Sequence, residues 1–261
     1  MDNRLAKGMV LIAMLLTGSA YGDRGSASDL ADTAAEFYTY YENWLQWQNQ
    51  RPGRYHGSDF PEEIFENENY LKLQEMGPVV VPMLLAHYLE CPLLERLVKD
   101  TCGLKFGEIL FHEHGVQGRK AVYIEEFPDT LYLGTLPRGL PLLRWWAARG
   151  IHTQRWFWER WNQYVAYKQQ GKEDLAAERL ERIGEIGIDA LPFLIRLISS
   201  GHEELIPIAS NVSKRPWASE SITLPENATK EQCEAWWNKH QKDYTIPDYN
   251  PLDLLRECVK N

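Results

Sequence analysis

The chain lacks the short motifs that accompany common hydrolase and nucleotide-binding chemistries. It contains no G-x-S-x-G nucleophile elbow, no glycine-rich phosphate loop and no H-E-x-x-H zinc motif. Basic residues are also in deficit, since 28 Lys and Arg stand against 37 Asp and Glu and give a formal net charge of −9. A field of that sign repels a phosphate backbone, so we expect no nucleic-acid partner. The sequence predicts no catalytic residue and no cofactor.

Long apolar runs are missing as well, and the clearest apolar run lies near the first residue. Two basic residues precede the run over 9–16, and three small residues follow it. This order is typical of a secretory signal, and the run is shorter than the roughly 20 residues that a membrane-spanning helix needs. We therefore expect a signal peptide over 1–22, a single α-helical domain over 23–261 without a transmembrane span, and a periplasmic or secreted location.

Cysteine is sparse, and all four cysteines follow the predicted signal. An even number in an exported protein permits disulfides, with three connectivities. Sequence proximity favours Cys91 with Cys102 and Cys233 with Cys258. Buried thiols are the alternative, because cysteine is often buried and a core of this size does not need disulfides for stability.

What the chain does contain is one sequence pattern twice. Residues 70–85 and 180–195 align so that the glycine and the proline of the first copy recur 110 residues later. The matching pairs are Gly77 with Gly187 and Pro82 with Pro192. An internal repeat indicates a structural unit that is used twice. We expect each copy to be a helical hairpin that turns at a left-handed glycine and has proline near the start of its second helix.

Further helices are expected around the two copies. Apolar residues at steps of three and four predict a helix over 29–50 before the first copy. Before the second copy, the residues from 141 to 150 predict a short helix that Gly150 closes. Thr153 is then the expected cap of a separate helix through Gln170.

Capping residues mark the starts of two other helices. Asn67 or Asn69 is suited to cap the first helix of the first copy, because a short polar side chain accepts from an unpaired amide there. After a predicted loop over 214–228, Thr229 and Gln232 have the spacing of a capping box. We expect C-terminal capping helices over 229–261.

The order of helix, glycine, small or apolar residues, proline and leucine resembles a HEAT-like repeat. The second copy carries it most fully, with Gly187, Ala190, Leu191, Pro192 and Leu194. The chain is thus similar to HEAT-like repeat proteins of the exported bacterial type, with two recognisable degenerate repeats. The resemblance implies an all-α fold, an α-solenoid-like stack of helical hairpins whose HEAT-like units cover about 66–102 and 176–213.

An aromatic and loop insertion over 111–170 separates the two units. Two short β-prone stretches within 120–139 predict a small β-hairpin there. Next to it, His112 and His114 are two residues apart, so their imidazoles face the same way in an extended backbone and can bind zinc or a similar ion. No third ligand stands at a recognisable spacing, and a solvated polar loop is the alternative.

Tryptophan is abundant, with ten in the chain and five between residues 145 and 161. Exposed indole faces stack against sugars, which makes Trp145, Trp156 and Trp158 candidates for a ligand platform. The alternative is that these large aromatic residues anchor packing between helices.

Three functions follow from these candidates. The first is a non-catalytic exported HEAT-like repeat protein that binds or scaffolds another protein. The second is a carbohydrate-binding or carbohydrate-active protein that uses helices over 145–161. The third is a metal-dependent enzyme at His112 and His114.

Overall fold

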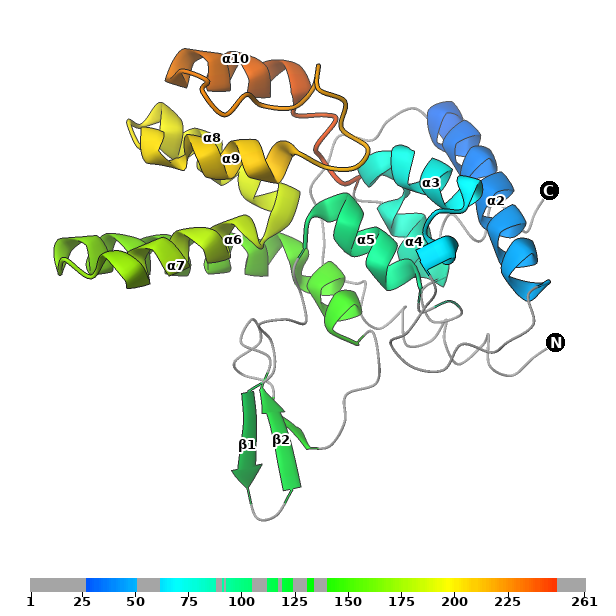
Figure 1. The fold of residues 1–261 in the computed structure, drawn as a ribbon, viewed down its shortest axis with the longest axis horizontal. Helices are drawn as coiled ribbons and strands as arrows, with labels where there is room; N and C mark the ends of the chain where they lie inside the picture. Colours follow the sequence, from blue (N-terminus) through cyan, green and yellow to red (C-terminus); the bar gives the residue numbers. More distant parts are fainter. Residues whose placement is uncertain are drawn as a thin grey trace.

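The fold is predominantly helical in the computed structural model, which describes residues 27–50, 62–87, 91, 93–104, 112–116, 119–123, 131–133 and 140–247. For residues 27–31, and for the residues just named between 112 and 152 apart from Trp146, it describes the backbone alone. Figure 1 shows two groups of helices side by side, α2 to α5 in one and α6 to α10 in the other. The sequence-based expectation of a helical fold is confirmed at this level.

The first group is built on a long helix packed against short ones. Its elements are α2 (Ala27–Asn49), the 3-10 helix η1 (Glu62–Ile64), α3 (Glu68–Glu75), the 3-10 helix η2 (Gly77–Val80), α4 (Val81–His87) and α5 (Leu94–Cys102). Asn67 caps α3, because its side-chain oxygen accepts from the amide of Asn69 at 3.0 Å. Trp44 of α2 is fully buried and donates from Nε1 to the Ile64 carbonyl at 3.3 Å.

The second group contains α6 (Leu140–Gln169), α7 (Glu173–Gly184), η3 (Gly187–Ala190), α8 (Leu191–Ser199), η4 (Glu203–Leu205), α9 (Ile206–Ser213) and α10 (Lys230–His240). The prediction of two helices between residues 141 and 170 was wrong. Gly150 lies inside α6, and Thr153 is a buried residue of that helix rather than its cap. A glycine within a helix costs only about 1 kcal/mol relative to alanine, so Gly150 does not by itself end α6.

The two glycine turns have the same backbone conformation. Gly77 has φ 69° and Gly187 has φ 75°, both left-handed, as predicted. Each glycine opens a four-residue 3-10 helix, η2 or η3, that leads directly into the next helix. Pro82 and Pro192 fall in the first turn of α4 and α8, where a missing amide donor costs little. The order helix, 3-10 helix, helix therefore occurs twice.

Three short strands lie between the two groups in the sequence. They are β1 (His112–Val116), β2 (Arg119–Tyr123) and β3 (Leu131–Leu133), which form an antiparallel sheet in the order β1-β2-β3. In the register of β1 with β2, His112 is opposite Tyr123 and Val116 is opposite Arg119. Figure 1 shows this sheet projecting away from the helices.

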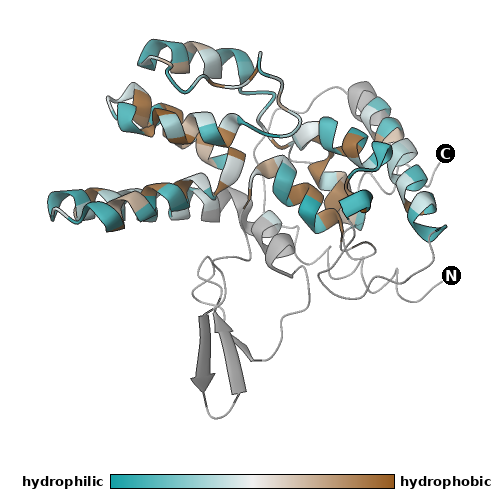
Figure 2. Cartoon of the chain, viewed as in Figure 1, coloured by the Kyte–Doolittle hydropathy of each residue, from teal (hydrophilic) through white to brown (hydrophobic). Residues whose placement is uncertain are grey.

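The helices of the second group lie in successive layers. Figure 1 shows α6 and α7 as a hairpin, α8 and α9 above it, and α10 on the outside. The buried side of α8 consists of Leu191, Leu194, Ile195, Leu197 and Ile198. Hydrophobic residues are concentrated on the inner helices, whereas much of α7 and α10 is hydrophilic (Figure 2). Across the described residues, no helix combines the length and the apolar character needed to cross a membrane.

The capping box at α10 is confirmed and gives a first prediction. The Thr229 side chain accepts from the amide of Gln232, whose side chain accepts in return from the amide of Thr229 at 2.8 Å. We expect Thr229→Ala to lower the free energy of unfolding by about 1 kcal/mol, since a helix amide loses its partner. Thr229→Ser keeps the hydroxyl and is the control in urea unfolding. Equal losses in the two variants would contradict the capping role.

Candidate functional site

The predicted metal ligands lie in the small sheet. His112 and His114 are both residues of β1, but their side chains are outside the described part of the structure. Among the side chains that the structure does describe, no group of three or more His, Cys, Asp or Glu could hold a metal ion. A metal site at His112 and His114 therefore stays a prediction, which metal analysis of tag-free protein can test.

The three tryptophans of the predicted platform, Trp145, Trp156 and Trp158, differ in how far the structure describes and exposes them. Trp156 is only 4% exposed, so its indole face cannot stack on a sugar. Trp158 is half-buried and packs edge to face on Phe157 and Phe193, with ring centroids 5.3 Å and 6.2 Å apart. The side chain of Trp145 is not described. For Trp156 and Trp158, the anchoring of helix packing is the better interpretation, because large aromatic residues add much apolar contact area.

The cysteines are buried where they are described. Cys91, Cys102 and Cys233 are all buried, and no disulfide joins Cys91 to Cys102. Cys258, the favoured partner of Cys233, lies outside the described residues. Burial raises the pKa of the Cys233 thiol, because the thiolate is poorly solvated there.

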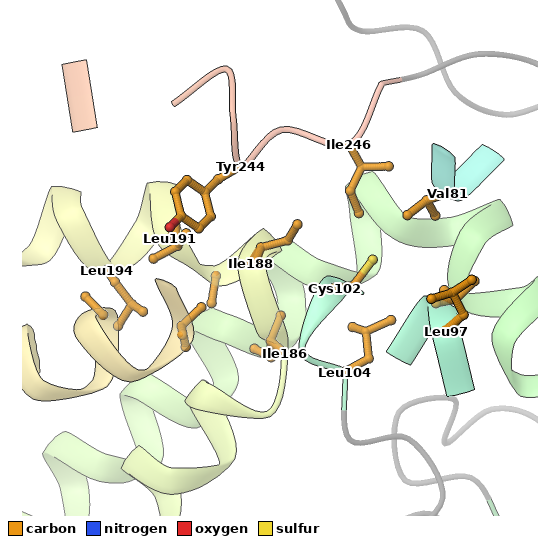
Figure 3. Packing of buried hydrophobic residues seen from close by; sticks show 14 of the residues in the cluster. Val81, Leu97, Cys102, Leu104, Ile186, Ile188, Leu191, Leu194, Tyr244 and Ile246 are labelled. Carbon is orange, nitrogen blue, oxygen red and sulfur yellow. The ribbon is translucent and has the colours of Figure 1, made fainter. Parts of the chain in front are cut away.

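What the structure brings together, and the motifs did not predict, is a joint between the two helical groups. A Cβ atom on Gly187 would overlap the carbonyl oxygen of Cys102 and lie 2.9 Å from the carbonyl carbon of Gly103. The glycine turn of the second group therefore packs directly on the end of α5 in the first. Ile186, Ile188, Leu104 and Ile246 belong to the apolar cluster around this contact (Figure 3).

The other glycine turn is covered by a residue from the far end of the described chain. A Cβ atom on Gly77 would lie 3.2 Å from Cδ2 of Trp217. The same indole donates from Nε1 to the carbonyl of Thr101 at 2.9 Å. Each glycine turn therefore packs on residues of the other helical group. A Cβ atom would overlap the backbone at Gly187, whereas at Gly77 the ring of Trp217 would have to shift by a few tenths of an ångström.

Charged groups surround this joint. Arg215 donates from Nη2 to the Asn211 carbonyl at 2.8 Å, and burial lowers the pKa of its guanidinium. Burial also raises the pKa of Asp100, while the nearby positive charges of Arg96 and Arg215 act in the opposite direction. Arg96 lies 3.6 Å from Asp100 and 3.8 Å from the centre of the Phe65 ring. These residues position the ends of the helices rather than form a recognisable catalytic group.

Tyr244 completes the joint from the C-terminal side. Its hydroxyl donates to the carbonyls of Ser213 at 2.8 Å and Ile222 at 3.0 Å, and its ring centre lies 4.9 Å from that of Trp217. Burial raises the pKa of Tyr244 to about 12, because the phenolate would be removed from water.

The raised pKa gives a pH prediction. An unfolded tyrosine ionises near pH 10, whereas folded Tyr244 holds its proton to about pH 12. The folded state therefore binds more protons across that window, and the contribution of Tyr244 to stability falls as the pH rises through it. We expect the difference in unfolding free energy between the native chain and Tyr244→Phe to shrink from pH 10 upward. Parallel stability curves in denaturant titrations would contradict this assignment.

Exposed carboxylates are frequent on the N-terminal elements of the first group. We define the acidic face by its exposed carboxylates: Asp32, Glu36, Glu42, Glu62, Glu63, Glu66 and Glu68. The described residues of 27–50 and 62–71 contain no Lys or Arg, although the side chain of Lys72 in α3 lies close enough to Glu68 to interact with it and Arg96 of α5 approaches Glu62 to 3.9 Å. Such a face attracts a basic surface by long-range electrostatics.

Sequence reasoning missed Arg215 and Trp217 because they lie in a segment that it assigned to a loop, and it missed Tyr244, which falls within the predicted capping helices over 229–261. One local signal was present, since Trp217 follows Pro216 in that loop. A large aromatic residue beside proline indicates that the loop is packed rather than solvated. Its partner Gly77 is 140 residues away, and no short-range pattern identifies such a pair.

Comparison with known proteins found no similar protein whose role could be considered for this chain. No family model matches the chain, and no curated protein or solved structure was found to be similar to it.

Proposed function

We propose that this chain is a non-catalytic, exported protein whose HEAT-like helical stack binds or scaffolds another protein. The observation that carries the proposal is the twofold use of one helical unit with a left-handed glycine turn, at Gly77 and at Gly187. Stacked helical hairpins present extended surfaces, and repeat proteins commonly use such surfaces to bind partners.

In this proposal the two units form an α-solenoid-like stack, and the small sheet β1-β2-β3 is an insertion between them. The helix α10, which packs on α8, supports the role of a terminal cap, because the outermost helix of a stack needs a polar outer side. The apolar run over 9–16 supports export, with removal of residues 1–22 and a periplasmic or secreted location.

The charge of the first group supports a partner with a basic surface. The acidic face carries seven exposed carboxylates on α2, η1, α3 and the residues between the last two. Partners of opposite charge associate faster, and salt screens this effect when the charges are exposed. A nucleic acid is an unsuitable partner for this face, since its backbone is negative as well.

Native isolation with measured affinity tests the proposal. Protein isolated from the envelope and secreted fractions should lack residues 1–22 by mass and should co-purify with a saturable protein partner. The purified partner should then bind in calorimetry, with an affinity that falls as salt rises. Recovery of the full-length chain in the cytosol would contradict export, and isolation without any partner would contradict the binding role.

Charge reversal tests where the partner binds. We expect the triple variant Asp32→Lys, Glu42→Lys, Glu66→Lys to weaken binding by about tenfold or more, because close charge pairs across an interface contribute strongly. The control is Asp174→Lys, Glu181→Lys, Glu220→Lys, which changes the net charge equally on exposed positions of the second group. Equal weakening in the two variants would point to net charge rather than to the acidic face. Binding of a glycan instead of a protein would favour the carbohydrate alternative.

A further inference from the structure

Residues 214–246, which we name the clamp, follow α9 and are attached firmly to the second group. Ser210 of α9 donates to the Leu224 carbonyl at 2.8 Å, and the Leu224 amide donates to the Ser213 hydroxyl at 2.9 Å. Tyr244 returns to the same place through its hydrogen bond to the Ser213 carbonyl. These buried bonds tie two places in the clamp, at Leu224 and at Tyr244, to the end of α9.

From this base the clamp reaches across the joint to the first group. Trp217 covers the glycine turn at Gly77 and hydrogen bonds to the Thr101 carbonyl. Arg215 packs so closely on Gly103 that a Cβ atom there would lie 2.8 Å from its Cζ. Figure 3 shows Ile246 projecting toward Cys102 and Val81, which both belong to the first group.

The clamp and the contact at Gly187 both restrain the orientation of the first helical group relative to the second. The packing of Gly187 on Cys102, with the apolar residues around it, joins the two groups at the end of α5. The contact of Trp217 with Gly77 adds a restraint at another place on the first group, the turn between α3 and α4, and so limits movement of one group against the other. The indole is half-buried and has one hydrogen bond across the joint, so its contact can be lost without unfolding either helical group.

We propose that residues 214–246 are an intramolecular clamp that sets the orientation of one helical unit relative to the other, with Trp217 as its latch. Release of Trp217 removes the restraint at Gly77 and loosens the first group against the contact between Gly187 and Cys102, while Arg215 and Ile246 keep their contacts. The clamp therefore controls the curvature of the combined surface that the stack presents. The proposal concerns the geometry of the joint and does not require any particular partner.

Hydrogen exchange measured by mass spectrometry tests the clamp in the full chain. In Trp217→Ala, we expect peptides over 99–104 and 186–190 to exchange about tenfold faster or more, while peptides from α8 keep their native rates. Trp217→Phe keeps a ring over Gly77 and loses the bond to Thr101, so its joint peptides should exchange at intermediate rates. Trp47→Ala is the matched control, since Trp47 is a half-buried tryptophan in α2, outside the clamp.

The outcomes separate a latch from a general loss of stability. Faster exchange confined to the joint supports the clamp, and the same pattern in Trp47→Ala overturns it. Native rates at the joint in Trp217→Ala also overturn it, as does an equal acceleration in α8. If Trp217→Ala does not fold, Trp217→Phe decides: a change confined to the joint supports the clamp, and any other result overturns it.

Discussion

Gly187→Ala should lower the free energy of unfolding by about 3–5 kcal/mol, the largest effect that we expect from a single small substitution. Two costs add at this position. A left-handed residue with a Cβ costs about 1–2 kcal/mol, and forcing a group into a packed site costs about 1–3 kcal/mol more. The second cost is at the upper end, because the new Cβ would meet the backbone of Cys102 and Gly103, which cannot rotate away.

Gly171→Ala is the control that isolates the first cost. Gly171 has φ 69°, close to that of Gly187, and a Cβ there would meet nothing within 4 Å. We expect it to lose only about 1–2 kcal/mol in the same urea titration. If the two variants lose the same amount, the close packing of Gly187 on the first group makes no contribution to stability.

Trp44→Ala should lower the free energy of unfolding by about 3–5 kcal/mol. The Trp44 ring is fully buried, packs on Tyr70 with ring centroids 5.4 Å apart, and bonds to Ile64. Its removal leaves a cavity between α2 and α3 and an unpaired buried carbonyl. The cost therefore combines lost burial with an unsatisfied polar group.

Trp47→Ala is the matched control in the same helix. Trp47 is half-buried, so its loss should cost about 1–2 kcal/mol, measured by chemical unfolding with circular dichroism. Similar losses for the two variants would contradict the assignment of α2 as part of the first unit's core. A large loss for Trp44→Ala alone would show that the long helix stabilises the unit it precedes.

Local features of the fold could be predicted wherever the residue type at one position determines the local backbone conformation. Gly77 and Gly187 were expected to be left-handed because glycine tolerates that conformation best. Thr229 and Gln232 were expected to cap a helix because their spacing matches the reciprocal bonds of a capping box. In each of these cases, the interaction lies within a few residues of the chain.

Sequence-based prediction failed where contacts between residues far apart in the chain determine the structure. α6 continues through Gly150 although glycine disfavours a helix, because one glycine costs only about 1 kcal/mol relative to alanine and tertiary structure overrides so small a preference. Trp156 was a candidate platform, yet the fold buries it. Trp217 and Gly77 come together only through tertiary structure, so the clamp has no counterpart in any short sequence motif.

Equilibrium unfolding followed at individual tryptophans tests most directly the central claim that the two units are joined as one body. Labelling with 5-fluorotryptophan gives separate ¹⁹F NMR signals for Trp44 in the first group and Trp161 in the second, both of which are buried. Because each glycine turn packs on a distant part of the chain, we expect the two signals to lose their native intensity at one urea midpoint. Two well-separated midpoints would show that the units unfold independently and would contradict the joint.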